Sequence, residues 1–497
     1  MKRKFVLSLL LFVAAACSTA EARSEPQRFE ENWESLKSYN VPEWWRNSKF
    51  GIYFHWGPYT VPAYDTEWYS RWMYKKGSRF EKYHNLVYGK TDKFGYKDFI
   101  PMFTGEMFDA DEWAKLFKEA GAQFAGPCAE HADGFAMWDS ALTEWDSKDM
   151  GPKIDVVGEL QRAIKKQGMK YIITYHRHWL YAWYPTWDKT TDCSDPKNAG
   201  LYWKGFKDGD FDVKGVRNFN ADVVADEEFC KEWYDRLKEL MTKYDPDVIW
   251  FDNRMNLISE KYRLKFLADY YNIGADRKKE VVCTYKFSDL PEGTAVLDLE
   301  RSRMSDKMDY TWLTDDSIDW GAWCDVQNPE YKSVNRLLDF LIDVVAKNGA
   351  VLLSITPDKR GVMPIDVQNR LREMGAWLKI NGEAIYDTRP WVVYGEGPQK
   401  IVEGHLSERK NADAVAEDIR FTINGKQLYA TCLDWPASGK VTIKTLKKGN
   451  KHLAEPIKKV SMLGSKEKIS FEQTAAGLVV TFPKEKPCDH AFVLKIN

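Results

Sequence analysis

The feature that most constrains the fold is a repeated alternation of short apolar runs and amphipathic helical patterns between about residues 48 and 390. Runs of the first kind predict strands at 50–54, 124–128, 171–175, 247–251, 280–285, 295–299 and 351–355. Patterns of the second kind predict helices at 111–120, 156–167, 228–244, 334–347 and 365–380. Repeated βα units imply a parallel sheet, and this many in one chain favour a (β/α)8-like TIM barrel of the α/β class.

The pattern changes after Pro390. The later apolar runs are short and β-rich, and they lie at 419–423, 427–431, 440–443, 478–482 and 491–496. Turn residues such as Asn424-Gly425 separate them, and no helical pattern lies between them. This is typical of a β-sandwich. We therefore expect a barrel domain over 23–390 and a C-terminal β-sandwich domain over 391–497.

The first 22 residues have the pattern of a secretory signal peptide. A basic start at residues 2–4 precedes an apolar run at 5–16, and Ala20-Glu21-Ala22 offers a cleavage site. A competing interpretation is a lipoprotein signal, because residues 14–18 weakly resemble a lipobox in which Cys17 is lipidated. Both predict export, to the periplasm or the medium or as a membrane-anchored lipoprotein. No other stretch approaches 18 apolar residues, so no membrane span is expected.

Charge and aromatic content narrow the class of partner. The 72 Lys+Arg residues balance 74 Asp+Glu residues, which argues against a nucleic-acid partner. Aromatic residues make up 14% of the chain, including 21 Trp. Flat, partly polar Trp and Tyr side chains suit a cleft that stacks on sugar rings, although a large aromatic core would explain the same number.

Polar residues follow several predicted strands, at the rim where barrel enzymes place their active sites. His55, His131 and His176 follow the first three strands, Asp252 follows the fourth, and Glu300 ends the strand near 297. Two chemistries fit such a rim: metal hydrolysis through His and carboxylate ligands, and glycoside hydrolysis through two carboxylates. For metal hydrolysis the sequence offers only a weak H-x-H pattern and lacks an H-E-x-x-H motif. The Trp residues favour glycoside hydrolysis. We expect no metal and no cofactor.

A set of motifs in a fixed order resembles glycoside hydrolase family 29, the α-L-fucosidases. They lie at 49–57, 61–63, 67–69, 130–140, 149–153, 246–252, 312–317, 341–357 and 381–386. The resemblance covers roughly residues 40–395 and extends to a C-terminal sandwich, which the family also has. It implies a retaining exo-hydrolase that releases terminal α-L-fucose from fucosylated glycans through a covalent glycosyl-enzyme intermediate.

The resemblance also implies roles for individual carboxylates. Asp252, at the end of the W-x-D strand, matches the family nucleophile, and Glu300 is the best positional match for the acid/base. The alternative for Glu300 is a structural ion pair with Arg301 or Arg303. In that case the acid/base would be one of Asp298, Asp315 and Asp316.

Sugar contacts carry over in the same way. His55, Glu67, His131 and Trp250 match family contacts, and either Tyr175 or His176 supplies one from the third strand.

Three positions depart from the family pattern. The usual second His of a pair is Ala132, Asn253-Arg254 follows the nucleophile, and Ser302 replaces a common Gly. Ala132 keeps two alternatives open: an enzyme acting on a related sugar such as an α-L-galactoside, and a non-catalytic fucose-binding protein on the same fold. The sequence makes no prediction of the oligomeric state.

Overall fold

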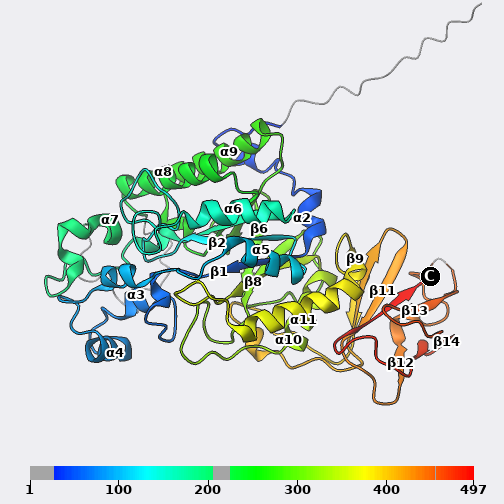
Figure 1. Cartoon of the computed structure of the whole chain (residues 1–497). Helices are drawn as coiled ribbons and strands as arrows, with labels where there is room; N and C mark the ends of the chain where they lie inside the picture. The colour runs from blue at the N-terminus through cyan, green and yellow to red at the C-terminus, as the bar shows by residue number, and fades with distance from the viewer. Residues whose placement is uncertain (1–26, 205–223, 454) are drawn as a thin grey trace, which may run out of the picture.

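The computed structural model describes residues 27–204, 224–453 and 455–497. Figure 1 shows a barrel with helices around it and, beside it, a smaller domain built of strands, drawn in orange and red. The expected signal segment and Cys17 lie outside the described residues, as does the part of the long loop after the third strand that covers 205–223. In the part of the chain that is described, no helix has the length and apolarity needed to cross a membrane.

Eight parallel strands close into a barrel in chain order, which confirms the predicted fold. They are β1 (Phe50–Phe54), β2 (Phe124–Glu130), β3 (Lys170–Tyr175), β4 (Val248–Phe251), β5 (Val282–Lys286), β6 (Val296–Glu300), β7 (Trp312–Ser317) and β8 (Gly349–Ile355). The sequence predicted seven of these and missed β7. The last four of its six residues, Thr-Asp-Asp-Ser, are polar although every residue of the strand is buried.

Alternation along the strands divides the apolar side chains between two cores. One core fills the barrel interior and includes Tyr53, Ile172, Trp250 and Leu352. A larger core lies between the barrel and its helices. Successive side chains of a strand point to opposite faces, so neighbouring residues serve different cores.

Helices cover the barrel on the outside. The five predicted helices are present as α5 (Ala110–Glu119), α6 (Val156–Lys166), α8 (Glu227–Tyr244), α10 (Val334–Ala346) and α11 (Ile365–Asn381). The structure adds α1 (Trp33–Leu36), α2 (Glu43–Ser48), α3 (Tyr69–Trp72), α4 (Arg79–Val87), α7 (Ala199–Tyr202) and α9 (Glu260–Asp276). Loops without a helix join β5 to β6 and β6 to β7.

The C-terminal domain is a sandwich of two antiparallel sheets, as predicted. One sheet has the order β13-β16-β11-β10-β9 and the other β12-β15-β14. The strands are β9 (Arg389–Glu396), β10 (Ile419–Asn424), β11 (Gln427–Cys432), β12 (Lys440–Ile443), β13 (Val460–Met462), β14 (Ser470–Gln473), β15 (Leu478–Thr481) and β16 (Phe492–Ile496). The sequence did not predict β9, β13 and β14.

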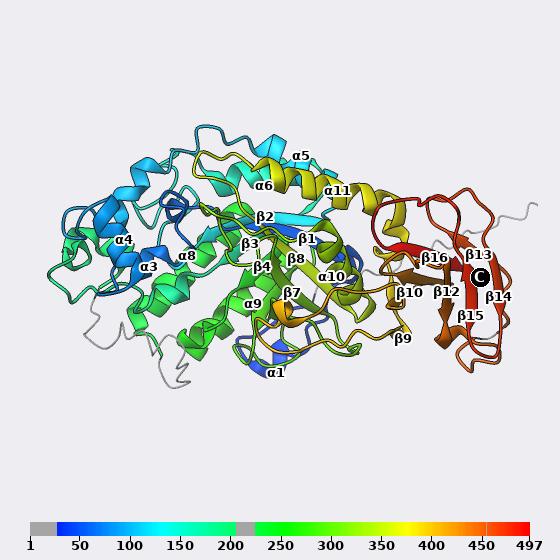
Figure 2. The same ribbon diagram turned by 90° about the horizontal axis from the view of Figure 1, so that it is seen from below.

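One segment of the sandwich domain returns to the barrel. After β9 the chain runs back along the barrel towards β7, as Figure 2 shows in orange. It contains the short 3-10 helix η8 (Glu408–Lys410), and the amide of Glu408 donates to the carbonyl of Arg301 just after β6. The sandwich therefore contributes residues to the face of the barrel on which the strands end.

Candidate active site

A cavity of about 1000 Å³ opens at the carboxyl ends of the barrel strands. Its lining comes from the ends of β1, β2, β3, β4, β5, β6 and β7, from the loops that follow β1 and β7, and from the returning segment of the sandwich domain. Of the residues expected from the sequence, it brings together His55, Glu67, His131, His176, Trp250, Asp252 and Glu300.

Three histidines form one wall of this cavity. The ring centroids of His55 and His131 are 5.3 Å apart, those of His55 and His176 5.2 Å, and those of His131 and His176 4.7 Å. Nδ1 of His55 contacts the Ser354 hydroxyl at 3.4 Å, and Nδ1 of His176 contacts the Cys128 thiol at 3.3 Å. These partners leave the Nε2 atoms of His55 and His176 available to a ligand.

The histidine wall is uncharged at neutral pH. Burial lowers the pKa of His131 from 6.5 to about 3, although nearby Asp252 opposes the shift. Burial and the neighbouring imidazoles lower the pKa of His55 and His176 well below 6.5. Neutral imidazoles both donate and accept hydrogen bonds, which suits the hydroxyl groups of a neutral ligand.

Glu67 also lines the cavity, from the loop after β1. Its Oε2 accepts from the amide of Trp323 at 3.4 Å, so it joins the loops that follow β1 and β7. Burial raises the pKa of Glu67 from 4.5 to about 7. The group therefore changes charge near neutral pH inside the cavity.

The opposite wall is charged and is organised around Lys286, which the sequence analysis did not single out. Its Nζ lies 3.4 Å from Asp252 Oδ1, 3.1 Å from Glu300 Oε2, 3.0 Å from Asp315 Oδ1 and 3.8 Å from Asp298 Oδ2. Nζ also lies 4.7 Å from the centre of the Trp250 ring. Burial alone would lower the pKa of Lys286, but the four carboxyl groups raise it well above its ordinary value.

Two of these carboxyl groups are fixed behind the cavity. The indole of Trp250 donates to Asp298 at 2.8 Å, and the Tyr53 hydroxyl donates to Asp315 at 3.0 Å. Burial and neighbouring Asp298 raise the pKa of Asp315 well above its ordinary value. Lys286 opposes this shift, because its ammonium group favours the charged form of Asp315.

Exposure divides the carboxyl groups of the charged wall and its surroundings into two sets. The side chains of Asp252 and Glu300 are 17% and 14% exposed. Those of Asp298, Asp315 and Asp316 are 0%, 2% and 2% exposed. A ligand in the cavity can therefore reach Asp252 and Glu300 far more readily than the three aspartates considered as alternatives.

Asp252 presents one oxygen to the cavity. Among the described residues, its contacts converge on Oδ1, which accepts from the Asn253 amide at 2.8 Å and its side chain at 3.2 Å and pairs with Lys286. The carbonyl of Asn253 is held in turn by His178 Nε2 at 2.7 Å. This arrangement orients the carboxylate and leaves Oδ2 for a reacting atom.

The arginines near Glu300 have other partners. Arg301 pairs with Asp316 at 3.8 Å and donates to the carbonyl of Ala322 at 3.1 Å. Arg303 donates twice to Glu408 at 2.8 Å. In the described residues, the partners of the Glu300 carboxylate are Lys286 and His405, whose Nδ1 lies 3.7 Å from Oε2. Glu300 is thus not a structural partner of either arginine.

Tryptophans line much of the cavity. They are Trp68, Trp72, Trp179, Trp250, Trp320 and Trp323. Other tryptophans, such as Trp56, Trp138 and Trp183, are buried and do not line it. Both explanations of the aromatic content therefore hold: one part serves the cavity and the other the core.

Tyr175 does not line the cavity, which corrects the expectation of a sugar contact at this residue. Its ring packs against Trp233 and Phe251, and its hydroxyl donates to the carbonyl of Trp233 at 3.3 Å. Tyr175 and His176 are adjacent, and the alternation of a strand directs them to opposite sides of the barrel wall.

The three histidines are also the group in the described chain best placed to hold a metal ion. Their candidate ligand nitrogens all lie within 4.8 Å of one another. A tetrahedral zinc ion takes nitrogen ligands at about 2.0–2.1 Å. Two of these nitrogens that lie close to 4.8 Å apart would therefore have to move towards each other to bind one zinc ion. The lowered pKa values would allow binding, because imidazole must be neutral to bind a metal.

Seven cysteines are described, and all are free thiols; six of them are buried. No disulfide therefore stabilises the described part of the chain.

A TIM barrel whose strand ends present two accessible carboxylates among tryptophans and neutral hydrogen-bonding groups has the arrangement expected of a glycoside hydrolase. The sequence comparisons specify which one. The family model described as "Alpha-L-fucosidase" matches residues 16–383, and the model "Alpha-L-fucosidase C-terminal domain" matches 411–497. The chain belongs to the α-L-fucosidase family, which confirms the resemblance seen in the sequence.

Individual relatives agree with this assignment. The chain is 31% identical to tissue α-L-fucosidase of Mus musculus over 488 residues, covering 95% of each. It is 30% identical to the Homo sapiens tissue enzyme, over 99% of this chain and 96% of the other. The crystal structure of Thermotoga maritima α-fucosidase in complex with fucose superposes with a TM-score of 0.72 at 27% identity, covering 95% of this chain and 100% of the other.

Proposed function

We propose that this protein is a retaining exo-α-L-fucosidase in which Asp252 is the nucleophile and Glu300 the acid/base. The observation that carries the proposal is that the two accessible carboxylates of the cavity share one counter-ion. Asp252 Oδ1 and Glu300 Oε2 lie 3.4 Å and 3.1 Å from the same Lys286 Nζ.

This shared contact limits how far apart the carboxylates lie. Asp252 Oδ1 lies 3.4 Å and Glu300 Oε2 3.1 Å from the same nitrogen, so the distance between these two oxygens cannot exceed the sum of the two contacts. Retaining glycosidases hold their carboxyl groups about 5–5.5 Å apart, whereas inverting enzymes need about 6.5–9.5 Å to admit a water. This limit includes the retaining separation and only the lower end of the inverting range, so the proposal of retention rests on the family resemblance.

In the first step, Asp252 Oδ2 attacks the anomeric carbon while Glu300 gives its proton to the departing oxygen. A covalent glycosyl-enzyme forms, and the aglycone leaves. In the second step, Glu300 takes a proton from water, the water oxygen bonds to the anomeric carbon, and the Asp252 carboxylate is released. Lys286 stabilises the negative charge that each carboxylate carries when it is ionised.

The neutral wall would hold the sugar. His55, His131 and His176 offer hydrogen bonds to ring hydroxyls, and Glu67 adds a further polar contact. Ala132, at the position of the family's second histidine, is buried and does not line the cavity. We propose that His176, whose ring lies beside that of His131, supplies the missing polar contact.

The test of the nucleophile is Asp252→Ala assayed with an aryl α-L-fucoside. We expect loss of nearly all hydrolysis and recovery of turnover with azide, giving a fucosyl azide of inverted configuration. The matched control is Asp276→Ala, which removes an exposed carboxylate at the end of α9 and should leave the rate unchanged. Full activity of Asp252→Ala would overturn the assignment.

The test of stereochemistry and substrate is product analysis by NMR. We expect α-L-fucose as the first-formed anomer from fucosylated oligosaccharides, in a panel that contains α-1,2, α-1,3, α-1,4 and α-1,6 linkages and L-galactosides. A first-formed β anomer would contradict retention. Faster release of L-galactose than of L-fucose would assign the related-sugar alternative instead, and loss of activity on treatment with a chelator would revive metal hydrolysis.

Export remains a proposal that rests on the N-terminal sequence. Fractionation of expressing cells should place the wild-type protein outside the cytoplasm. Cys17→Ala should release it from the membrane fraction only if the lipoprotein signal is the one used.

A further inference from the structure

The strand that carries the proposed acid/base ends with little support from the barrel itself. In the described range 224–453, a loop and no helix joins β6 to β7. β6 pairs with β7 as far as Glu300, but its register with β5 stops at Asp298, two residues earlier. One side of the backbone at Glu300 therefore needs a partner from outside the barrel.

The returning segment of the sandwich domain supplies this partner. The carbonyl of Glu300 accepts from the amide of Leu406 at 3.0 Å, and the carbonyl of Arg301 accepts from the amide of Glu408 at 2.8 Å. The same segment reaches the side chain of Glu300, because His405 Nδ1 lies 3.7 Å from Oε2. The second domain thus contacts both the backbone and the carboxylate of the proposed acid/base.

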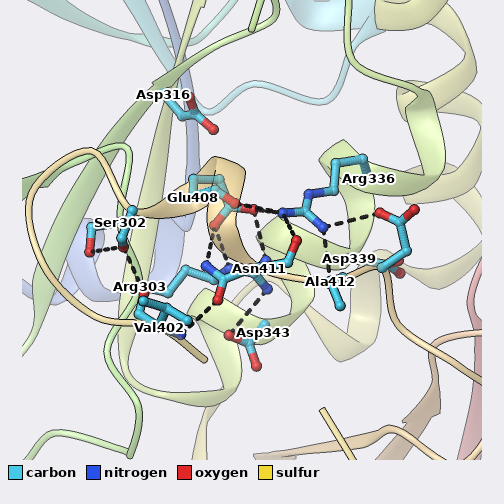
Figure 3. A network of polar contacts seen from close by, with 12 residues as sticks. Ser302, Arg303, Asp316, Arg336, Asp339, Asp343, Val402, Glu408, Asn411 and Ala412 are labelled. Carbon is cyan, nitrogen blue, oxygen red and sulfur yellow. Dashed lines mark hydrogen bonds and ion pairs between the residues drawn. The ribbon is translucent and has the colours of Figure 1, made fainter. Parts of the chain in front are cut away.

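A buried ionic network anchors the returning segment to the barrel, and Figure 3 shows Glu408 at its centre. Glu408 is 2% exposed and accepts from Arg303 twice at 2.8 Å. Arg336 of α10 pairs with the same carboxylate at 2.7 Å, and the side chain of Asn411 donates to it at 3.2 Å. Removing one partner of such a network leaves the other charges buried and unpaired, so the anchor holds the segment in one position.

The backbone is strained where the two segments meet. Arg301 has φ of 43° and Leu406 has φ of 56°, in the left-handed region that bulky residues rarely adopt. Such conformations persist only where the surrounding structure imposes them. Loss of the anchor would allow both residues to relax, and the backbone that carries Glu300 would move with them.

We propose that Glu408 is a positioning residue for the acid/base, acting through the backbone of Glu300 and not through the sugar. This inference rests on the proposed function, which assigns the acid/base to Glu300. The sandwich domain then completes the active site of the barrel. Proton transfer requires the acid to lie within hydrogen-bond reach of the departing oxygen, so a small displacement of Glu300 slows it.

The experiment compares two aryl α-L-fucosides whose leaving groups differ in their need for a proton. Phenoxide departs poorly and depends on the acid, whereas 2-chloro-4-nitrophenoxide departs with little protonation. Glu408→Gln keeps the shape of the side chain and removes its charge. We expect it to lower the ratio of kcat/KM for the phenyl fucoside to kcat/KM for the chloronitrophenyl fucoside by about tenfold. Glu408→Asp, which keeps the charge, should recover most of the ratio.

A purely structural role, or a contact between Glu408 and the sugar, would instead lower both kcat/KM values equally. Arg336→Gln breaks the same anchor from α10, and Arg336 does not line the cavity, so this variant should reproduce the lower ratio without touching the substrate. It also tests the proposal if Glu408→Gln does not fold. An unchanged ratio in the folded Glu408→Gln and Arg336→Gln variants would overturn the proposal.

Asp247→Asn is the matched control. It removes a buried carboxylate that directly precedes β4, at the end of the barrel away from the cavity, where Asp247 accepts from the amide of Tyr171 at 2.9 Å. It should lower the melting temperature and leave the ratio unchanged. The melting temperature of every variant is measured, so that a loss of stability is recognised separately from a change in the ratio.

Glu300→Ala separates a failure of this inference from a failure of the proposed function. We expect it to lower the ratio further than Glu408→Gln does, and the double variant to show no additional fall, because both residues act through one group. A ratio that falls in Glu300→Ala but not in the anchor variants would overturn the role of Glu408 alone. An unchanged ratio in Glu300→Ala would overturn the proposed acid/base itself.

Discussion

The two halves of the barrel rim differ in charge and in how they are built. The ends of β1, β2 and β3 carry His55, His131 and His176, whose pKa values burial lowers until they are neutral. The ends of β4, β5 and β6 carry Asp252, Lys286 and Glu300, which form ion pairs. One half can recognise a neutral ligand, and the other can move charge and protons.

The comparison shows how one cavity can perform both tasks. Burial without a counter-ion favours the neutral form of a group, whereas burial beside an opposite charge favours the charged form. The first half contains no cation among its three imidazoles, and the second contains one cation among four carboxyl groups. Each half can be tested separately.

The largest effect should come from removing the cation of the charged half. Lys286→Met leaves the carboxyl groups without their counter-ion, and we expect kcat/KM on an aryl α-L-fucoside to fall by about 10³-fold. The control is Lys49→Met, because Lys49 is equally buried but does not line the cavity. A loss below about fivefold would mean that the charged half does not depend on its lysine.

The next effect concerns Glu67 and pH. Burial raises the pKa of Glu67 from 4.5 to about 7, so the folded protein holds a proton that the unfolded chain has lost. This contribution to stability is present below pH 4.5 and disappears as pH rises to about 7. Relative to Glu67→Gln, we expect the wild-type protein to lose on the order of 3 kcal/mol over that window. Denaturant titrations of both proteins at pH 4.5, 6 and 8 measure it.

A parallel pair of curves, with no change in the difference between the two proteins, would show that Glu67 is ionised throughout that window. The neutral half would then contain a charge that the comparison does not allow.

A smaller effect is expected from the neutral half itself. His131→Phe would remove the hydrogen bond that we propose His131 makes to the sugar. We expect KM to rise by about 10–100-fold with a smaller change in kcat. His84→Phe is the matched control, since His84 is buried and bonded to Tyr69 and Phe94 away from the cavity. If His131→Phe instead abolished kcat and left KM unchanged, the histidine wall would take part in the chemical steps.

The smallest effect is expected at Tyr175, just behind the histidine wall. Tyr175→Phe removes the hydrogen bond to the carbonyl of Trp233, which contributes about 1 kcal/mol to stability. Activity should stay within about twofold of the wild-type value, as steady-state assays would measure. A marked rise in KM would show that Tyr175 contributes to substrate binding after all.

The first half of the barrel was easier to predict from the sequence than the second. β1, β3 and β4 are continuous apolar runs with long helices between them, and polar residues mark their ends. β7 was missed because its polar residues Asp315 and Asp316 are buried by ion pairs that only the closed barrel creates. A strand stabilised by tertiary partners carries little local signal.

The site shows the same limit. The sequence indicated Asp252 and Glu300 because they end predicted strands and match a family pattern. A single lysine at a strand end, such as Lys286, gives no sign that four carboxyl groups surround it. His405 was unpredictable for another reason: it lies in a different domain, about 100 residues after Glu300, and the anchored Glu408 brings it back.

The most direct test of the central claim is to trap the glycosyl-enzyme and find which residue carries the sugar. The wild-type protein would be incubated with 2-deoxy-2-fluoro-α-L-fucosyl fluoride, and its intact mass and peptide masses would be recorded. We predict the addition of one 2-fluorofucosyl group, on the peptide that contains Asp252 and at that residue. A label on any other carboxylate, or turnover of the reagent with no label and an inverted product, would contradict the account.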